Sequence, residues 1–522
     1  MITTYVRNAF IILATAGFLT ACIEKPRTDE NRLQRFEYRI GFPNAGNAWA
    51  KERALEVIRG AKFEIVAVFN DLNDSDIAQA LIDASNRKVR VGVGGDQRNE
   101  NQTNGFQLLK NQRSSNRFLD QRTANQRALA AANKATADEI LRTRLNFNRQ
   151  NRSAEYNASP YDGRVEYNFI TADSANCWLS TGGANPAAFS SGGTWTVSFY
   201  FQSNDLCRDL TNEGTQLAFG GLFGDEGKPA FGTFRNSKAQ VDPNFYFRID
   251  DLAFYLWFAP QERPSVPVIN ELLRAEDSIY FGARALTQDI INDVQNHSAN
   301  RSHILNALEY KARLPAVYGK NFTLKGVIGN EGDSNLTSVP NYLATAPEYA
   351  WHKWNSFTVA YNTLVSSSCP TVNGTQINVP YESDDTALGV QGFTTENNTV
   401  NLTSIHCDLQ TLRNTVNGSA TNTSALSFRR ANLALPFNAF LIDKNGRRPR
   451  VVLMSSDLRR RYYFDSGNVQ DAEPKRTRND YYAITDAFVL VIEPAVPGYR
   501  KSIFDDFEKL LDDFYAQGVD TW

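Results

Sequence analysis

Two short segments of the chain place an amide and a carboxylate at the same spacing. The first reads Val165-Glu-Tyr-Asn-Phe-Ile-Thr-Ala-Asp173, and the second reads Leu435-Pro-Phe-Asn-Ala-Phe-Leu-Ile-Asp443. Glu166 is the side chain here that could act as a nucleophile or a base. Asn168 and Asn438 could hydrogen-bond the oxygens of an anion, but an amide cannot neutralise its charge. These two segments are therefore the first candidates for a chemical site.

Each segment is followed by an apolar run and then by small or polar residues. In the first case the run is Cys177-Trp-Leu-Ser-Thr181, which leads into Gly182-Gly-Ala-Asn185. In the second case the run is Val451-Val-Leu-Met454, which leads into Ser455-Ser-Asp-Leu458. We therefore expect each segment to be a strand with a second strand after it.

In order and spacing, these segments resemble the phospholipase D superfamily, in which an HxKxxxxD motif and a GSxN sequence occur in each of two α/β halves. The resemblance implies that one His attacks phosphorus, the other His protonates the leaving oxygen, and Lys, Ser and Asn hold the phosphate. Glu166 and Pro436 stand at the His positions, and Asn168 and Asn438 at the Lys positions. The other motif-equivalent positions are Asp173, Gly183 and Asn185 in the first half, and Asp443, Ser456 and Leu458 in the second.

The departures from this motif argue against its chemistry. Both His and both Lys are replaced, and the Pro436 side chain can neither attack phosphorus nor carry a proton. Without the Lys pair, a Glu166 carboxylate would repel a phosphodiester. Loss of one such clamping group typically costs about 10²- to 10³-fold in rate. We therefore predict no phospholipase D-type catalysis and assign no catalytic residue.

The remaining chemistry-bearing residues give weaker hypotheses. The chain has 4 His and lacks any CxxC spacing, so we expect neither a metal nor a cofactor. We interpret His352 as a partner-facing or packing residue, His406 as structural, and His297 and His303 as surface residues. A basic cluster near the second motif is either an anion-binding surface or a solvated loop whose charge nearby carboxylates offset. Its best candidates for a phosphate contact are Arg459, Arg460 and Arg461, which follow the GSxN equivalent.

The N-terminus reads as an export signal. An apolar run from about Ala9 to Leu19 is too short to span a membrane comfortably, and it ends in Leu19-Thr-Ala-Cys22. This sequence resembles the bacterial lipobox, whose cysteine becomes lipidated and N-terminal; the alternative is an ordinary signal peptide with an incidental cysteine. We therefore expect residues 1–21 to be a signal peptide and residues 22–36 a polar tether. The residue after Cys22 is Ile23 and not Asp, which favours the outer membrane.

Four further cysteines follow Cys22. An even number in an exported protein suggests disulfides, and local pairs need the shortest loop closures. We predict the pairs Cys177–Cys207 and Cys369–Cys407, with free buried thiols as the alternative.

The elements that must position these residues follow a repeated pattern. Helical spacing over 48–61, a strand over 63–69, a helix over 74–85 and a strand over 89–93 predict a parallel crossover. The same order returns when Val268–Ile279 is laid over Ala54–Ile65, with strands at 279–283 and 322–328 and a helix at about 287–308. An amphipathic helix over 502–515 closes the chain. The fold class is therefore α/β, with two related halves about a pseudo-twofold axis.

We expect the first half at 37–235, with a polar insertion at about 99–162. The second half is expected at 236–522, with an insertion at about 332–427 that is rich in Asn, Thr and Ser. The formal net charge of -2 means that any anion site must be a local patch.

Three functions fit these observations. The first is a lipid-anchored, catalytically degenerate protein that binds or assembles in the bacterial envelope. The second is a divergent phosphodiesterase acting on phospholipid or nucleic acid, and the third is a purely structural protein that uses its insertions. The expected partners are a membrane through lipid on Cys22, phospholipid headgroups or another polyanion, and an unidentified protein. We expect a monomer that faces the periplasm or the outside.

Overall fold

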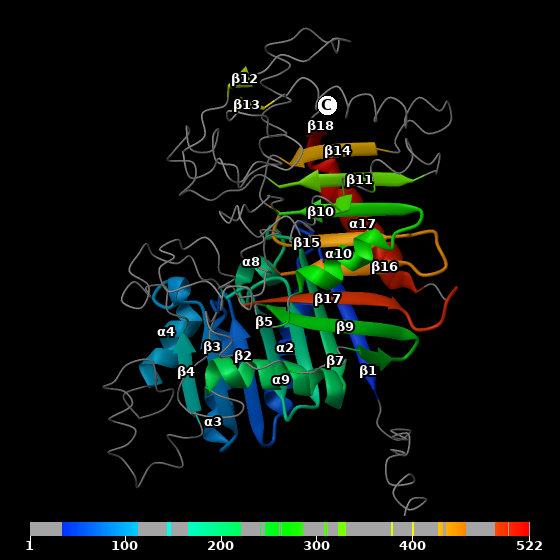
Figure 1. Ribbon diagram of the computed structural model, residues 1–522. Helices are drawn as coiled ribbons and strands as arrows, with labels where there is room; N and C mark the ends of the chain where they lie inside the picture. The colour runs from blue at the N-terminus through cyan, green and yellow to red at the C-terminus, as the bar shows by residue number, and fades with distance from the viewer. Residues whose placement is uncertain are drawn as a thin grey trace, which may run out of the picture.

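The computed structural model contains two β-sheets flanked by helices (Figure 1). The residues that it describes are 34–112, 143–147, 165–220, 241, 246–259, 262, 264–284, 307–308, 311, 322–329, 377–378, 399–400, 426–431, 435–455, 486–498 and 501–520. Within these ranges, no helix is long and apolar enough to cross a membrane.

The first sheet has seven strands in the order β1-β7-β6-β5-β2-β3-β4. Strands β2, β3 and β4 are parallel to one another, and the other neighbours are antiparallel. The parallel pairing of β2 with β3 confirms the crossover predicted from the sequence. The strands are β1 (Arg35–Gly41), β2 (Glu64–Phe69), β3 (Arg90–Gly95), β4 (Thr143–Phe147), β5 (Asn168–Ala172), β6 (Asn176–Ser180) and β7 (Thr196–Gln202).

The second sheet repeats this order strand for strand. Its nine strands follow the order β18-β14-β11-β10-β15-β16-β17-β9-β8, so the seven from β9 to β14 reproduce the first sheet, with matching directions. Strands β8 and β18 extend its two edges. The strands are β8 (Tyr246–Ile249), β9 (Leu252–Ala259), β10 (Ser278–Ala283), β11 (Thr323–Ile328), β14 (Leu426–Ala431), β15 (Asn438–Ile442), β16 (Arg450–Met454), β17 (Ala487–Pro494) and β18 (Gly518–Asp520). A short separate pair is formed by β12 (Ile377–Asn378) and β13 (Thr399–Val400).

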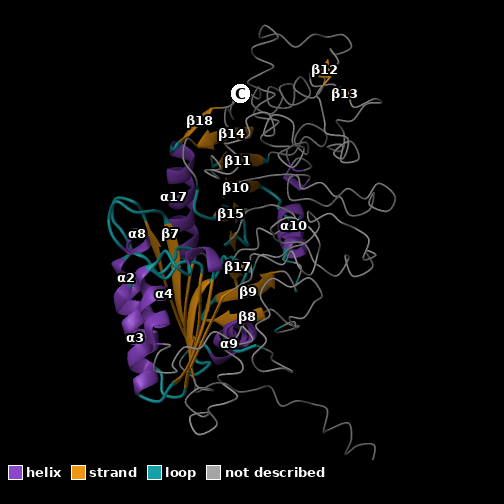
Figure 2. Cartoon of the chain, turned by 90° about the vertical axis from the view of Figure 1, so that its left-hand side faces the viewer, coloured by secondary structure: helices purple, strands orange, loops and turns teal. Residues whose placement is uncertain are grey.

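The helices repeat as well. Figure 2 shows α2 and α9 on opposite sides of the first sheet, and their counterparts α10 and α17 on the reversed sides of the second. A two-fold rotation produces this arrangement, which confirms the predicted fold class of two related α/β halves. The helices are α2 (Ala48–Gly60), α3 (Ser75–Asn86), α4 (Asn104–Asn111), α8 (Pro186–Phe189), α9 (Asn204–Ala218), α10 (Ser265–Leu273) and α17 (Ser502–Ala516), with a 3-10 turn at Gln97–Asn99.

One apolar core joins the halves. It takes side chains from the inner faces of both sheets and from α9 and α17, including Phe199, Phe254, Phe437 and Phe514. Separate apolar clusters lie on the outer faces, under α2, α3 and α4 in the first half and under α10 in the second. The halves therefore share the burial of their inner faces.

Three expected ranges differ from the structure. Strand β1 begins at Arg35, inside the range 22–36 expected as tether. Strand β4 and helix α4 lie inside the expected insertion 99–162, and β14 begins at Leu426, at the end of the expected insertion 332–427. Strand β4 was expected to be part of a polar insertion because it is short and carries Arg144 and Asn146 within a polar stretch. The signal peptide, Cys22 and most of the second insertion lie outside the described residues.

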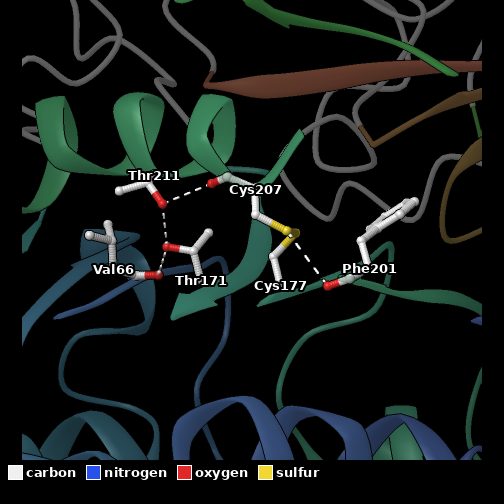
Figure 3. Close-up of a disulfide and its surroundings, with 6 residues drawn as sticks. All are labelled: Val66, Thr171, Cys177, Phe201, Cys207 and Thr211. Carbon is white, nitrogen blue, oxygen red and sulfur yellow. Dashed lines mark hydrogen bonds between the residues drawn. A yellow bond between two sulfur atoms is a disulfide. The ribbon is translucent and has the colours of Figure 1, made fainter. Parts of the chain in front are cut away.

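A disulfide joins Cys177 on β6 to Cys207 on α9, as predicted (Figure 3). Beside it, the Thr211 hydroxyl bonds the Cys207 carbonyl oxygen at 2.8 Å and lies 2.9 Å from the Thr171 hydroxyl, which reaches the Val66 carbonyl oxygen at 3.3 Å. These contacts fasten α9 to the inner face of the sheet. The other predicted pair, Cys369–Cys407, lies outside the described residues.

Candidate functional site at the junction of the two halves

The two motif aspartates anchor equivalent loops. The Asp173 carboxylate accepts hydrogen bonds from the backbone N–H groups of residues 62–64, at 2.8–2.9 Å. The Asp443 carboxylate does the same for residues 276–278, at 2.8–3.3 Å. Both aspartates have a positive φ, near 50°, at the end of their strand. Each therefore holds the loop that leads into the neighbouring antiparallel strand, β2 or β10.

The two motif asparagines also have matching contacts. The side-chain oxygen of Asn168 accepts from the backbone N–H of Asn70 at 3.1 Å, just beyond the end of β2. The side-chain oxygen of Asn438 accepts from the backbone N–H of Arg284 at 2.7 Å, just beyond the end of β10. Both asparagines are buried. In each half, the residue at the Lys position therefore fixes the backbone where a strand ends.

Glu166 lies where the halves meet. Its carboxylate accepts a hydrogen bond from the Asn70 side chain at 2.8 Å and lies 3.7 Å from the guanidinium of Arg284 in the second half. Its backbone N–H donates to the Asp486 carbonyl oxygen at 2.8 Å. Pro436, the equivalent residue, has no N–H and cannot repeat this contact. Glu166 is 7% exposed, and its carboxylate contacts the Asn70 amide and the Arg284 guanidinium at the junction.

Asp96, just after the end of β3, supports the first motif. Its carboxylate accepts from the backbone N–H of Val165 at 2.8 Å and forms an ion pair with Arg98 at 2.8 Å. Asn99 completes the support by donating to the carbonyl and side-chain oxygens of Asn70. Contacts from Asp96 and from Asn70 therefore fix the segment that carries Glu166.

Asn185, the GSxN equivalent, caps the short helix α8. Its side-chain oxygen accepts from the Ala188 N–H at 2.8 Å, and its amide donates to the Asp71 carboxylate at 2.6 Å. Burial raises the pKa of Asp71, and the hydrogen bond from Asn185 opposes this only in part. The other carboxylate oxygen of Asp71 is buried without a hydrogen-bond partner.

The hydroxyl residues that end the next strands are equivalent as well. Thr181 exchanges hydrogen bonds with the backbone of Val197, and Ser455 does so with Phe488. The repeat can be followed to Ser455 and no further, because Ser456 and the three arginines Arg459, Arg460 and Arg461 lie outside the described residues. All four histidines lie outside them too.

A buried tyrosine lies behind the site. The Tyr167 hydroxyl donates to the Glu213 carboxylate at 2.8 Å, and burial, followed by the charge of Glu213, raises its pKa well above the ordinary value. Tyr167 is fully buried and packs against Phe169 and Phe258. It therefore connects the first motif to α9 and to β9 of the second half, and does not face a ligand.

Where the halves meet, the Glu166 carboxylate and the Arg284 guanidinium lie beside a set of amides, and the carboxylates of Asp96 and Asp71 support the first motif and the helix that follows it. No group of three or more His, Cys, Asp or Glu side chains among the described residues could hold a metal ion. Such a site can accept and donate hydrogen bonds, and Glu166 is its candidate acid–base group. The sequence reading missed Asn70, Arg284 and Asp96. The overlay of Ile279 on Ile65 already aligns Arg284 with Asn70, so this signal was available.

Comparisons with known proteins give a likeness to solved structures only. No protein-family model matches the chain, and no curated protein sequence matches it. Phosphatidylserine synthase from Haemophilus influenzae Rd KW20 is similar with a TM-score of 0.46 and 11% identity, over 93% of this chain and 87% of that one. Polyphosphate kinase from Porphyromonas gingivalis gives 0.40 and 9%, over 94% and 52%. Nuc, a phospholipase D family member from Salmonella typhimurium, gives 0.23 and 13%, over 35% and 93%.

Proposed function

We propose that this chain is a lipid-anchored protein of the bacterial envelope that has a phospholipase D-like architecture and binds a partner without cleaving phosphodiesters. One observation supports the proposal that catalysis has been lost. In both halves, the residues at the Lys and Asp positions of the motif use their side-chain oxygens to hold backbone N–H groups. Residues engaged in this way serve as scaffold.

The chemistry of the junction supports the same conclusion. Phosphodiester cleavage of the phospholipase D type needs a nucleophile and an acid on opposite sides of phosphorus, with cations to hold the oxygens. Pro436 supplies neither group. Glu166 is negatively charged when ionised, and one guanidinium 3.7 Å away must serve both it and any phosphate.

A divergent phosphodiesterase is the second candidate. The observation that favours it is the Glu166–Arg284 pair, because a buried carboxylate beside a cation could activate water near a bound anion. Activity would then depend on Glu166.

Turnover assays separate the two candidates. The mature protein would be incubated with phosphatidylcholine, bis-p-nitrophenyl phosphate and DNA, with and without divalent metal. We expect no turnover above the buffer. Turnover that is lost in Glu166→Gln but kept in Glu52→Gln, an exposed glutamate on α2, would establish the phosphodiesterase and overturn the binding proposal.

Membrane attachment has its own test. Cells expressing the full chain would be fed radiolabelled palmitate, with Cys22→Ala as the variant and Thr28→Ala, in the expected tether, as the matched control. We expect label in the wild type and the control, and none in Cys22→Ala. Label that persists in Cys22→Ala would remove the anchor from the proposal.

The basic cluster is proposed as the anion contact. Binding of the mature protein to anionic vesicles and to DNA would be compared between the wild type and the double variant Arg459→Ala/Arg461→Ala. We expect weaker binding in the variant, with an effect that shrinks as salt is added. Unchanged binding would exclude this cluster as the anion surface.

A further inference from the structure

A groove separate from the motif site runs along the outer edge of β1. Its volume is about 340 Å³. Four segments border it: β1, the start of α2, the turn between β8 and β9, and the start of α17. The lining residues are Phe36, Glu37, Tyr38, Arg39, Trp49, Asp250, Leu252, Lys501, Ser502 and Ile503.

The groove lies against backbone as well as side chains. Residues Phe36 to Arg39 are consecutive, and consecutive side chains of a strand point to opposite faces. All four can border one groove only if it follows the edge of the strand. β1 is the last strand of its sheet, and in the described ranges it pairs with β7 alone (Figure 1). Every second residue of such a strand directs its N–H and C=O groups away from its neighbour.

The two sides of this edge differ in chemistry. On the inner side, Phe36 and Tyr38 lie with Leu252 and Ile503 and are packed against the shared core. The Tyr38 hydroxyl donates to Asp506 at 2.7 Å, so this apolar wall is fixed in place by α17.

On the outer side the groove is bordered by Trp49 and by charged side chains. Glu37 is already paired with Arg53 at 2.9 Å, and Lys501 lies 3.9 Å from Asp251. Arg39 is exposed and has no ion-pair partner in the part of the chain that the structure describes. Along β1 itself, Arg39 therefore offers an unmatched positive charge, while Asp250, on the turn between β8 and β9, is an exposed carboxylate of the same groove.

We propose that this edge binds an extended segment of a partner protein by strand addition, and that the segment alternates apolar and acidic residues. Its backbone pairs with the N–H and C=O groups of β1 that point away from β7. Its apolar side chains meet the wall formed by Phe36, Tyr38, Leu252 and Ile503, and an acidic side chain meets Arg39. At a rise of about 3.3 Å per residue, the four bordering β1 residues accommodate about four residues of the partner.

This inference rests on the proposed binding role and gives it a site and a class of partner. Its test needs neither the lipid anchor nor the motif residues. A finding of phosphodiesterase activity would overturn the proposed function. A failure of peptide binding would overturn only the proposal that the groove binds an extended segment.

The probe is a fluorescein-labelled synthetic peptide of alternating valine and glutamate, whose binding to the mature protein is followed by fluorescence anisotropy. Two control peptides accompany it. One carries N-methyl groups on alternate backbone nitrogens, which blocks strand pairing, and the other replaces glutamate by lysine. Arg39→Glu is the test variant. Arg59→Glu, an exposed arginine at the far end of α2, is the matched control.

We expect saturable binding of the glutamate peptide, which the N-methylated peptide does not show. Arg39→Glu should weaken it about five- to tenfold and improve binding of the lysine peptide, as charge reversal at an exposed ion pair predicts, while Arg59→Glu should change neither. Absence of saturable binding, or equal binding of the N-methylated peptide, would overturn the proposal. So would a dimer that Arg39→Glu dissociates, or vesicle binding that the same variant abolishes, because the occupant would then be a second copy or a lipid surface.

Discussion

The carboxylate of Asp173 receives three consecutive backbone N–H groups, and that of Asp443 receives three at the equivalent loop. Charge-assisted hydrogen bonds of this kind are stronger than neutral ones. Asp443 has one contact more, an ion pair with the buried guanidinium of Arg450 at 2.8 Å. The same residue type at the same motif position therefore supports the second half more heavily than the first.

Replacing either aspartate should lower the stability of the fold. We expect Asp173→Ala to lower the free energy of unfolding by about 2–4 kcal/mol, because three N–H groups lose a charged acceptor. Asp443→Ala should cost more, because removing one partner of a buried ion pair typically costs about 3–5 kcal/mol, and Arg450 then keeps only its pair with Glu271, 3.1 Å away, among the described residues. Urea unfolding measures both. The control is Asp83→Asn, on the exposed face of α3, which should stay within about 0.5 kcal/mol. An unchanged stability of Asp173→Ala would contradict the anchoring role.

Asp71 gives a pH-dependent expectation. Burial raises its pKa above the ordinary value of 3.8, so the folded chain holds this proton more tightly than the unfolded chain does. Stability from this group is therefore present at low pH and is lost as the pH rises through the raised pKa. Asp71→Asn removes that loss while it keeps an acceptor for Asn185.

The measurement is urea unfolding of the wild type and Asp71→Asn between about pH 3.5 and pH 7, in the range where carboxyl groups titrate. The stability difference should grow in favour of the variant as the pH rises. A variant that is less stable than the wild type at pH 7 would show that the fold needs the ionised carboxylate.

At the scale of elements, helix α9 depends on its covalent link to β6. In the second half, the repeat places Val451 and Phe504 where the first half has Cys177 and Cys207, and both are buried in the shared core. The second half thus fastens its helix by apolar packing, whereas the first half adds a disulfide across a sequence separation of 30 residues.

Loss of this disulfide should therefore be costly. The chain-entropy model gives about 3–4 kcal/mol for a loop of this length. We expect the double variant Cys177→Ser/Cys207→Ser to lose that much free energy of unfolding and to unfold at a lower urea concentration, with α9 gaining amide hydrogen exchange ahead of α17. If the variant and the oxidised wild type have the same midpoint, the link contributes nothing to stability.

The elements with strong periodicity could be predicted from the sequence alone. Helices α2, α3 and α17 begin and end within about two residues of the predicted limits, because each has a clear apolar stripe. Asp74 caps α3 by accepting from the N–H groups of Asp76 and Ile77, as its residue type indicated. Strand β4 could not be predicted, because its burial comes from α9 and β3, which the local pattern does not contain.

The site was predictable in part. The motif positions marked the correct strands, but their roles depend on partners far away in sequence. Asn168 bonds a backbone N–H that lies 98 residues away, and Asn438 bonds one that lies 154 residues away. The pairing of Glu166 with Arg284 also needs the two halves to meet. Spacing along the chain cannot show such contacts without the fold.

At the scale of the whole molecule, the halves cannot be separated without exposing their core. The shared cluster includes Phe199 and Phe201 from the first half and Phe437, Phe488 and Phe507 from the second. Polar contacts cross the same boundary, where the Trp195 indole donates to Asp513 at 2.6 Å and Tyr38 donates to Asp506. Burial of a large aromatic side chain contributes about 1.5–3 kcal/mol, so several such side chains exceed the net stability of an ordinary domain.

We therefore expect neither half to fold alone, although their topologies match. Residues 34–235 and residues 236–522 would be produced separately and then mixed, with the intact chain as the control. Each fragment alone should bind a hydrophobic dye and lack a cooperative unfolding transition, because it exposes the face that the other half covers. The mixture should recover one transition near that of the intact chain. A fragment that unfolds cooperatively by itself would show that the halves are independent domains, and that the junction around Glu166 can open without unfolding either one.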